Sequence, residues 1–254
     1  MNWSGISDNS LMGKILRFPL RFLPVQTQMP IMQGRLKGKK WIVGSSSHGC
    51  WLGSYEYGKQ RLFERTIAPG SVVFDLGGHV GFYTLLASEL VGHKGQVFVF
   101  EPVPRNLLYL REHLRLNQVS NVTVIESAVS DKSGAVAFDE GLNSSMGHIA
   151  SHGRLQVKTV ALDELVSKGE IPVPDYMKID IEGAELLALV GSKSMLAKSH
   201  PTLFLATHGS RVHQECCRLL QSLGYQIQAI DGMNLQQASE ILATCIGRRP
   251  AGEV

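Results

Sequence analysis

Short apolar runs alternate with longer amphipathic segments along most of the chain, from Ser71 onward. Runs rich in β-branched and aromatic residues are typical of strands buried in a parallel sheet. Apolar residues that recur every three or four positions favour helices. We therefore expect strands at residues 72–76, 97–101, 122–126, 176–180, 203–207 and 225–230, and helices at residues 81–90, 105–116, 184–192 and 212–223.

Two further patterns interrupt this alternation. The run at residues 240–246 predicts a last, antiparallel strand, and two alternating segments between Ala135 and Val160 predict a hairpin inserted after the third strand. A parallel sheet needs helices on both faces, so the chain is expected to be an α/β protein with a three-layer, Rossmann-like architecture.

The first part of the chain gives weaker signals. Residues 34–44 predict a strand after a basic turn, and the polar run up to Gly58 predicts a loop. Residues 11–23 mix apolar and basic side chains that could contact a membrane surface, but Pro19 interrupts any helix there, and a packing arm is the alternative. We expect residues 1–66 to form an N-terminal extension and residues 67–254 to form the main domain.

Composition excludes several classes of protein. The net charge is only +3, and the basic residues are spread along the chain, which argues against a nucleic-acid partner. The four cysteines have no paired or metal-binding spacing. No apolar run is long enough for a transmembrane helix. These features predict a soluble protein of the cytoplasm.

A glycine-rich turn, DLGGHVGFYT, follows the first predicted strand. Asp75, Gly77 and Gly81 give the chain a tight bend with little side-chain bulk, so a ligand can approach backbone N–H groups at a helix start. Glu101 ends the second strand, beside this turn, where its carboxylate could accept hydrogen bonds from both ribose hydroxyls. The pair predicts a site for an adenosine cofactor.

A dinucleotide cofactor is the alternative. Its G-x-G-x-x-G fingerprint would require glycine at positions 79 and 82, which hold His79 and Phe82. A nicotinamide oxidoreductase is therefore disfavoured.

An acidic cluster, MKIDIEGAE, follows the fourth predicted strand. Asp180, Glu182 and Glu185 lie close enough in sequence to repel one another, so a cation, hydrogen-bond donors or a bound proton must compensate them. Asp180 or Glu182 could instead cap the next helix. A third reading is a divalent metal ion held by Asp180, Glu182 and His208.

His208 directly follows the fifth predicted strand, in the sequence FLATHG. With the usual strand order it would lie beside the acids of the fourth strand, where it could take the proton of an acceptor hydroxyl. A structural histidine at a strand end is the alternative. Before the main domain, Trp51, Tyr55 and Glu56 could cover the cofactor or the substrate, or only pack the extension.

Five segments together resemble the FkbM-type methyltransferases. They are VVFDLGGHVGFYTLLAS, VFVFEPVPRNLLYLREHLRLN, NVTVIESAVSDKSG, TVALDEL and MKIDIEGAE, in this order, and the resemblance covers about residues 50–230. It implies a class I methyltransferase fold with a mostly parallel seven-stranded sheet, S-adenosylmethionine as the cofactor, and O-methylation as the activity.

The resemblance also assigns residues to a cofactor site. It implies that the turn after the first strand holds the methionine end of the cofactor, Glu101 the ribose, and Ser127 with Ala128 the adenine. The complete expected set is Asp75, Gly77, Gly78, His79, Gly81, Phe82, Tyr83, Thr84, Glu101, Pro102, Asn106, Ser127, Ala128 and Asp180.

The chain departs from the family pattern at two positions. His79 stands where many relatives carry asparagine, and Ala206 where many carry a glutamate, which shifts the expected catalytic role to His208.

The sequence therefore predicts in-line transfer of a methyl group to a hydroxyl of a small-molecule or carbohydrate acceptor, without a resident metal. His208, Asp180 and Glu182 are the expected catalytic residues. A cofactor-binding protein without catalysis remains an alternative. A methyltransferase acting on amino groups of nucleic-acid bases is disfavoured, because the chain has Asp180–Gly183 where such enzymes carry an N-P-P-Y-like segment.

Overall fold

The structure is a computed structural model that describes residues 23–139, 148–149, 155–230, 232 and 234–245. Its strands are β1 (Gln28–Pro30), β2 (Lys40–Ile42), β3 (Val72–Leu76), β4 (Gln96–Phe100), β5 (Val122–Ile125), β6 (Ala128–Val129), β7 (Gly134–Asp139), β8 (His148–Ile149), β9 (Leu155–Val160), β10 (Tyr176–Ile179), β11 (Thr202–Ala206), β12 (Gln226–Ala229) and β13 (Glu240–Thr244). Its helices are α2 (His48–Leu52), α3 (Tyr57–Thr66), α4 (Phe82–Val91), α5 (Pro104–Leu116), α6 (Leu162–Ser167), α7 (Glu185–Val190), α8 (Lys193–Ser199) and α9 (Ser210–Ser222), with 3₁₀ turns at Val43–Ser45 and Gly92–Lys94.

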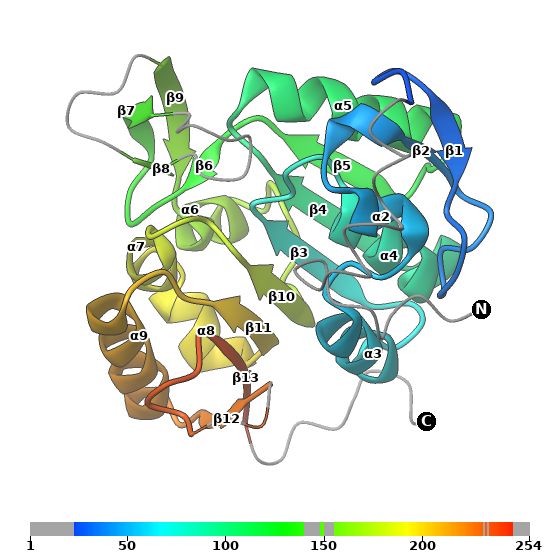
Figure 1. Cartoon of the computed structure of the whole chain (residues 1–254). Coiled ribbons are helices and arrows are strands. Elements are labelled where there is room, and N and C mark those ends of the chain that lie inside the picture. Colours follow the sequence, from blue (N-terminus) through cyan, green and yellow to red (C-terminus); the bar gives the residue numbers. More distant parts are fainter. Residues whose placement is uncertain (1–22, 140–147, 150–154, 231, 233, 246–254) are drawn as a thin grey trace.

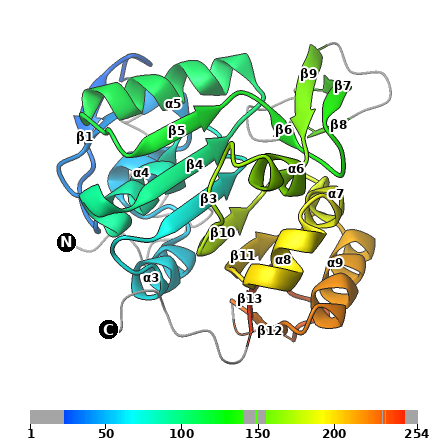
Figure 2. The same cartoon turned by 180° about the vertical axis from the view of Figure 1, so that it is seen from behind.

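A seven-stranded sheet forms the centre of the molecule, in the order β12-β13-β11-β10-β3-β4-β5 (Figures 1 and 2). The strands from β11 to β5 pair in parallel, whereas β13 runs antiparallel to both of its neighbours. The predicted class I sheet with its antiparallel last strand is therefore confirmed.

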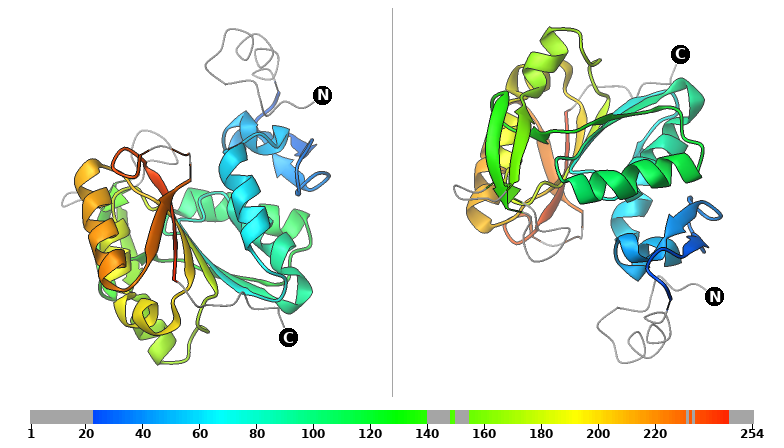
Figure 3. Two further views of the ribbon diagram at one scale, coloured as in Figure 1. Left: turned by 90° about the horizontal axis from the view of Figure 1, so that it is seen from below. Right: turned by 90° about the horizontal axis from the view of Figure 1, so that it is seen from above.

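Side chains that alternate along each strand build the two faces of this sheet. In β3, Val73 belongs to one apolar cluster, whereas Phe74 and Leu76 belong to the other. This period of two is the geometry of an extended strand buried on both sides. The blue to green helices cover one face and the yellow and orange helices the other, which gives three layers (Figure 3).

The N-terminal part of the described chain packs on the face that carries α4 and α5. β1 and β2 pair antiparallel, and Trp41 of β2 stacks on His113 of α5 with ring centroids 3.8 Å apart. His113 also joins the two parts through its ring nitrogens, one accepting from the amide of Ile42 and the other bonding to the carbonyl of Val80.

The sequence reading of this part needs two corrections. The predicted strand at residues 34–44 is ordered as a strand only at Lys40–Ile42, and the predicted loop up to Gly58 contains α2 and the start of α3. Residues 45–58 are rich in serine and glycine, so composition favoured a loop, but packing of Trp51 and Phe63 into the core stabilises α2 and α3. The division of the chain near residue 67 stays a prediction, and residues 11–22 lie outside the described residues.

A second sheet of four strands, β6-β9-β7-β8, lies beside the main sheet (Figure 1). β7 and β9 form the predicted hairpin, since they pair antiparallel from Gly134 to Phe138. β6 adds to it in parallel through Ala128 and Val129. The chain therefore passes from β5 into this second sheet at Ser127 and Ala128, the residues expected to contact the adenine.

Two short helices escaped the sequence reading. The helix predicted at residues 184–192 ends at Val190, and α8 begins a new helix at Lys193, while α6 follows β9 directly. Helices of six or seven residues complete fewer than two turns, so the helical period cannot be distinguished in them.

The chain reverses its direction of sheet growth at β3. From β3 the sheet grows through β4 and β5, and then resumes on the other side of β3 with β10. In open α/β sheets ligands bind at such a switch point, outside the carboxyl ends of the strands. Within the described part of the chain, no helix combines the length and the apolar character needed to cross a membrane.

Candidate functional site

A pocket opens at the carboxyl ends of β3, β4 and β10, at this switch point. Its empty space, including the part that is open to solvent, is about 980 Å³. The turn after β3, the residues that follow β4 and β5, the acidic segment after β10 and the N-terminal part all line it. The lining residues are Ser46, Cys50, Tyr55, Gly77, Gly78, His79, Val80, Phe82, Tyr83, Phe100, Glu101, Pro102, Val103, Asn106, Ser127, Ala128, Val129, Lys178, Asp180, Ile181, Glu182 and Ala184.

The turn after β3 can only be built from glycine at two places. At Gly77, which has a φ of +79°, a Cβ atom would lie 2.0 Å from the carbonyl oxygen of Asp180. At Gly78 it would lie 2.1 Å from Cγ2 of Val99. Both approaches are closer than any side chain permits, so the glycines let β3, β4 and β10 meet at the base of the pocket.

Glu101 lies directly after β4 and is almost fully buried in the pocket wall. Oε2 accepts the backbone amide of His79 at 2.8 Å, and Oε1 accepts the amide of Val103 at 3.0 Å and the side-chain amide of Asn106 at 3.2 Å. Burial raises the pKa of Glu101 to about 7, although these three donors oppose the shift. The carboxyl group is thus fixed in place, with lone pairs left for a ligand's hydroxyl groups.

His79 occupies a left-handed backbone conformation, with a φ of 50°. Among residues other than glycine, asparagine, aspartate and histidine adopt this region most readily. The exchange of asparagine for histidine therefore keeps the bend. Burial, together with the positive charges of Lys178 and Arg105, lowers the pKa of His79 to about 4, so the ring is neutral at pH 7.

Asp75, Gly81 and Thr84 lie behind the pocket rather than in its lining. Oδ2 of Asp75 accepts the hydroxyl of Thr84 at 2.6 Å, and Oδ1 lies 3.2 Å from Nζ of Lys178. Lys178 also donates to the carbonyl of Gly77 at 3.0 Å. Asp75 and Thr84 therefore support the glycine turn from below, and a direct contact of either with the cofactor stays a prediction.

Asp180 follows β10 and faces two ammonium groups. Oδ2 lies 3.8 Å from Nζ of Lys59 and 3.9 Å from Nζ of Lys178. Burial alone would raise the pKa of Asp180, but Lys178 and Lys59 outweigh it and lower the pKa, with smaller contributions from His208 and His79. Asp180 is therefore an ionised carboxylate at neutral pH.

Lys59, on α3, is a buried residue of the site that the sequence reading missed. Its ammonium group lies 2.7 Å from Oε1 of Glu240, on β13, and 3.2 Å from Oε2 of Glu56. Glu56 also accepts the hydroxyl of Tyr83 at 2.9 Å. Burial would lower the pKa of Lys59, but Glu56, Asp180 and Glu240 raise it. Lys59 directly follows the predicted loop up to Gly58, and a single lysine there gives no sequence signal for this contact.

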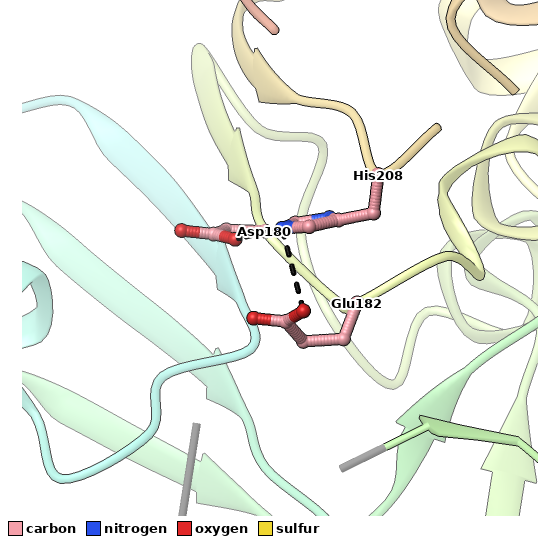
Figure 4. A group of neighbouring side chains, drawn as sticks. All are labelled: Asp180, Glu182 and His208. Atoms are coloured by element: carbon pink, nitrogen blue, oxygen red, sulfur yellow. Dashed lines mark ion pairs between the residues drawn. The ribbon is translucent and has the colours of Figure 1, made fainter. Parts of the chain in front are cut away.

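His208 lies beside the acids at the rim of the pocket (Figure 4). Nε2 is 3.4 Å from Oε2 of Glu182 and 3.8 Å from Oδ1 of Asp180. Nδ1 lies 2.8 Å from Oε1 of Glu185, whose side chain is completely buried. Since an ionised carboxylate only accepts hydrogen bonds, Nδ1 donates, which directs Nε2 toward the two other acids.

The hydrogen bond to Glu185, together with the charges of the three acids, raises the pKa of His208 above its usual value, although burial opposes the shift. The predicted proximity of His208 to the acids of the fourth strand is thus present. His208 itself is exposed and does not line the pocket as Asp180 and Glu182 do.

The alternatives for the acidic cluster differ in outcome. The cap reading is wrong, because Ala184 occupies the N-cap of α7 and no side chain bonds there. The metal reading keeps its geometry: one ligand atom from each of Asp180, Glu182 and His208 lies within 4.8 Å of the others. A second proton on His208, at Nε2, would compensate the charge of the two acids as well as a metal ion would.

Most of the predicted cofactor residues come together in this one pocket. Gly77, Gly78, His79, Phe82, Tyr83, Glu101, Pro102, Asn106, Ser127, Ala128 and Asp180 line it. Tyr55 lines it too, whereas Trp51 packs in the core and Glu56 bonds Tyr83. The turn at Gly77 and Gly78 fits the methionine end of S-adenosylmethionine. The buried carboxylate of Glu101 fits the ribose, and the small side chains of Ser127 and Ala128 fit the base.

Comparison with known proteins supports this reading. Residues 75–227 match the family described as methyltransferase FkbM domain. A hexuronic acid methyltransferase, AglP, of Haloferax volcanii is 30% identical over 138 residues, covering 54% of this chain and 56% of the relative. A 2-O-methyltransferase, NoeI, of Sinorhizobium fredii is 25% identical over 151 residues, covering 52% and 61%. The chain thus spans little more than half the length of these relatives.

A solved structure supports the fold. The crystal structure of a methyltransferase FkbM from Methylobacillus flagellatus matches with a TM-score of 0.52 at 17% identity, covering 78% of this chain and 55% of that one. The matches confirm the predicted resemblance, the class I fold, and S-adenosylmethionine as the cofactor of this kind of domain.

Proposed function

Because this chain belongs to the methyltransferase FkbM domain family, we propose that it transfers a methyl group from S-adenosylmethionine to a hydroxyl oxygen of a carbohydrate. The observation that carries the proposal is the orientation of His208, whose Nδ1 is held 2.8 Å from buried Glu185 so that Nε2 faces the rim of the cofactor pocket. The names of the two curated relatives, which mention a hexuronic acid and a 2-O-methyl transfer, support a sugar hydroxyl as the acceptor.

The cofactor half of the pocket would be formed by the turn at Gly77 and by Glu101. Bound S-adenosylmethionine supplies a methyl group on a positively charged sulfur. In this proposal Glu101 accepts hydrogen bonds from the ribose hydroxyls, while Ser127 and Ala128 contact the base. Ionised Asp180 provides the negative charge that a cationic cofactor requires.

His208 acts as the general base. The acceptor hydroxyl donates its hydrogen bond to Nε2. The proton would move to this nitrogen as the oxygen–carbon bond forms and the bond between the methyl carbon and the cofactor sulfur breaks, with the electron pair left on sulfur. Glu185 stabilises the imidazolium, because its carboxylate accepts from Nδ1. Glu182, 3.4 Å from Nε2, accepts a second hydroxyl of the sugar and aligns the acceptor.

Incubation with radiolabelled S-adenosylmethionine, a panel of glycosides and a glycan extract tests the proposal. We expect label in a glycoside or glycan, and mass spectrometry of the product to show an O-methyl group. His208→Ala should lower turnover by about 10²- to 10⁴-fold. Its affinity for S-adenosylhomocysteine, measured by calorimetry, should change less than twofold.

Two results would speak against the proposal. Label in a protein band or in nucleic acid would change the acceptor class, and full turnover by His208→Ala would remove the base. If calorimetry showed no binding of S-adenosylhomocysteine, a non-catalytic scaffold would replace the enzyme.

We also propose that residues 67–254 form the methyltransferase domain, that residues 1–66 extend it, and that the chain works in the cytoplasm. All four cysteines are free thiols. Free, mostly buried thiols suit a reducing compartment.

A further inference from the structure

We infer that the outer face of the β1–β2 hairpin binds the surface of an anionic lipid bilayer. This hairpin face consists of the outward side chains of β1, of the turn and of the start of β2, namely Pro30, Met32, Arg35, Lys37, Lys39 and Lys40. None of these residues lines the cofactor pocket, so the surface is separate from the site of methyl transfer.

The acidic residues, unlike the basic ones, are distributed unevenly along the sequence. Residues 9–55 contain seven lysines and arginines but no aspartate or glutamate, although the whole chain has 22 acidic residues. The rest of the chain therefore carries more acidic than basic residues. Such an asymmetry is typical of proteins in which one part of the chain meets an anionic surface.

The register of the hairpin decides which side chains point outward. Pro30 lies opposite Lys40, and Met29 lies opposite Trp41, which is fully buried. Side chains alternate along an extended strand, so Pro30 and Lys40 share the outer face. Met32 follows Pro30 by two positions and is 47% exposed. An apolar and a basic side chain therefore lie on the same outward face.

Four basic side chains gather in the turn and at the start of β2. Arg35, Lys37, Lys39 and Lys40 fall within six residues, and Lys37 and Lys40 are exposed. Glu89 of α4 faces the turn, with its carboxylate oxygens 3.0 Å from Nζ of Lys39 and 3.9 Å from Nε of Arg35. One carboxylate cannot balance four cations, so the turn keeps a net positive charge.

Among the described residues, charged groups on the helices packed against the hairpin do not reverse this sign. α2 has no acidic residue, and α4 contributes only Glu89. α5 carries three arginines against Glu112, which pairs with Arg115 at 2.7 Å. Glu126, which follows β5, pairs with Arg111 of α5. Each of these acids already has a cationic partner, so the basic residues of the turn stay in excess.

Exposed apolar side chains favour a bilayer over a nucleic acid as the partner. Val25, just before β1, is 64% exposed, and Met32 lies beside the basic turn. At a membrane surface apolar side chains enter the headgroup region while lysines and arginines reach the phosphates. A nucleic-acid backbone offers phosphates but no such apolar layer. The hairpin also lies at the edge of the molecule, away from α8 and α9 (Figures 1 and 2).

Co-sedimentation of the full chain with lipid vesicles tests the inference. Vesicles of phosphatidylcholine alone are compared with vesicles in which about a third of the lipid is phosphatidylglycerol, at low and at high salt. We expect at least about tenfold tighter binding to the anionic vesicles, because each basic residue near such a surface strengthens binding about fivefold. Added salt should weaken this binding, since it screens the charges.

Matched double charge reversals locate the contact. Lys37→Glu with Lys40→Glu should weaken binding to anionic vesicles by about 25-fold or more. Lys193→Glu with Lys198→Glu changes the net charge equally on the exposed side of α8, and should weaken binding by less than about threefold. Met32→Ser should weaken binding severalfold, because it removes an apolar contact. Urea unfolding checks that each variant is folded.

Three results would overturn the inference. They are equal binding to both kinds of vesicle, no binding to anionic vesicles at low salt, and equal losses in the two double variants, which would mean a response to net charge alone. If the chain bound duplex RNA or DNA but not vesicles, with the loss confined to the Lys37 and Lys40 variant, the hairpin face would recognise nucleic acid instead. The proposed methyl transfer would survive each of these results, because the cofactor pocket is formed by other residues.

Discussion

At the scale of single residues, the site depends on carboxyl groups whose ionisation is set by their surroundings. Glu101 and Asp180 face the same pocket, yet their pKa values shift in opposite directions. Glu101 is buried with three neutral donors, which leaves its pKa at about 7. Asp180 has two lysines near it, which lower its pKa. Only the first group should therefore titrate near neutral pH.

Glu101 should make cofactor binding depend on pH. Its ionised form is the better acceptor for ribose hydroxyls, so affinity for S-adenosylhomocysteine should rise as the pH increases from 6 to 8, through the pKa of about 7. Glu101→Gln should weaken binding by about 1.5 to 3 kcal/mol and flatten this dependence. Calorimetry at several pH values checks both. An equally steep dependence in Glu101→Gln would assign the titration to another group.

Glu185 should set the pH profile of catalysis. A general base works in its unprotonated form, and Glu185 raises the pKa of His208, so the rate of the wild type should rise with an apparent pKa above 6.5. Glu185→Gln should move this apparent pKa downward and lower the maximal rate about tenfold or more, because the ring loses its charged partner. Unchanged profiles would remove Glu185 from the mechanism, provided that affinity for S-adenosylhomocysteine is preserved.

At the scale of elements, the alternation of strands and helices was readable because buried parallel strands are apolar throughout. The six strands predicted from residue 72 to residue 230 agree with the structure to within one residue at each end. β-branched and aromatic runs mark such strands, and glycine or proline marks their ends. The usual strand order was assumed only to place the fifth predicted strand beside the fourth, and β11 does pair with β10.

Contacts between distant segments were not readable in the same way. The side chains of Lys59 and Glu240 meet although 181 residues separate them. Neither position carries a local pattern, because a buried lysine resembles a surface lysine in sequence. The carboxylate of Glu185 was noted only as part of an acidic run, and its role as the partner of His208 required the position of β11 next to β10.

The contacts of Lys59 tie α3 to β13 and to Asp180 at the end of β10, and they should stabilise the fold. Lys59→Met leaves three carboxylates without their shared cation, so we expect a loss of about 3 kcal/mol in the free energy of unfolding. In Lys59→Met with Glu240→Gln the loss should be smaller than the sum of the single effects, since one repelling charge is gone. Urea unfolding measures all three.

A surface lysine provides the comparison. Lys168 is 60% exposed and pairs with Glu164 on α6. Lys168→Met should change stability by less than about 0.5 kcal/mol. If Lys59→Met lowered the free energy of unfolding as little as Lys168→Met, solvent or a changed backbone would be compensating the three carboxylates. The stability of α3 would then not depend on Lys59.

At the scale of the whole molecule, buried ionisable groups couple stability to pH, and their signs differ. His79 and His113 have pKa values lowered to about 4, mainly by burial, whereas an unfolded chain would bind a proton at each near pH 6.5. Glu101 acts in the opposite direction, because its pKa of about 7 in the folded state exceeds the usual value of 4.5 for a glutamate. In His113, Nε2 accepts the amide of Ile42 and Nδ1 bonds to the carbonyl of Val80, so a second proton, which would occupy Nε2, would break the hydrogen bond from Ile42.

The net effect follows from counting protons between about pH 4.5 and 6.5. The unfolded state gains two protons at His79 and His113, and the folded state gains one at Glu101, so the unfolded state binds about one more. Stability should therefore fall with decreasing pH by about 1 kcal/mol per pH unit. His113→Gln removes one of the two histidines and should make stability nearly independent of pH in this window, although its stability at pH 7 is lower.

Urea unfolding at half-unit steps of pH measures this slope, with His93→Gln as the control on an exposed histidine. The control should keep the slope of the wild type. Glu101→Gln should make it steeper, because a group that opposes the two histidines is gone. Two results would contradict this prediction: a wild-type stability that stays level from pH 6.5 to 4.5, or a His113→Gln slope equal to that of wild type. Either would mean that the ring of His113 takes up a proton while keeping its contact with the amide of Ile42, and that the N-terminal part does not depend on the neutral ring.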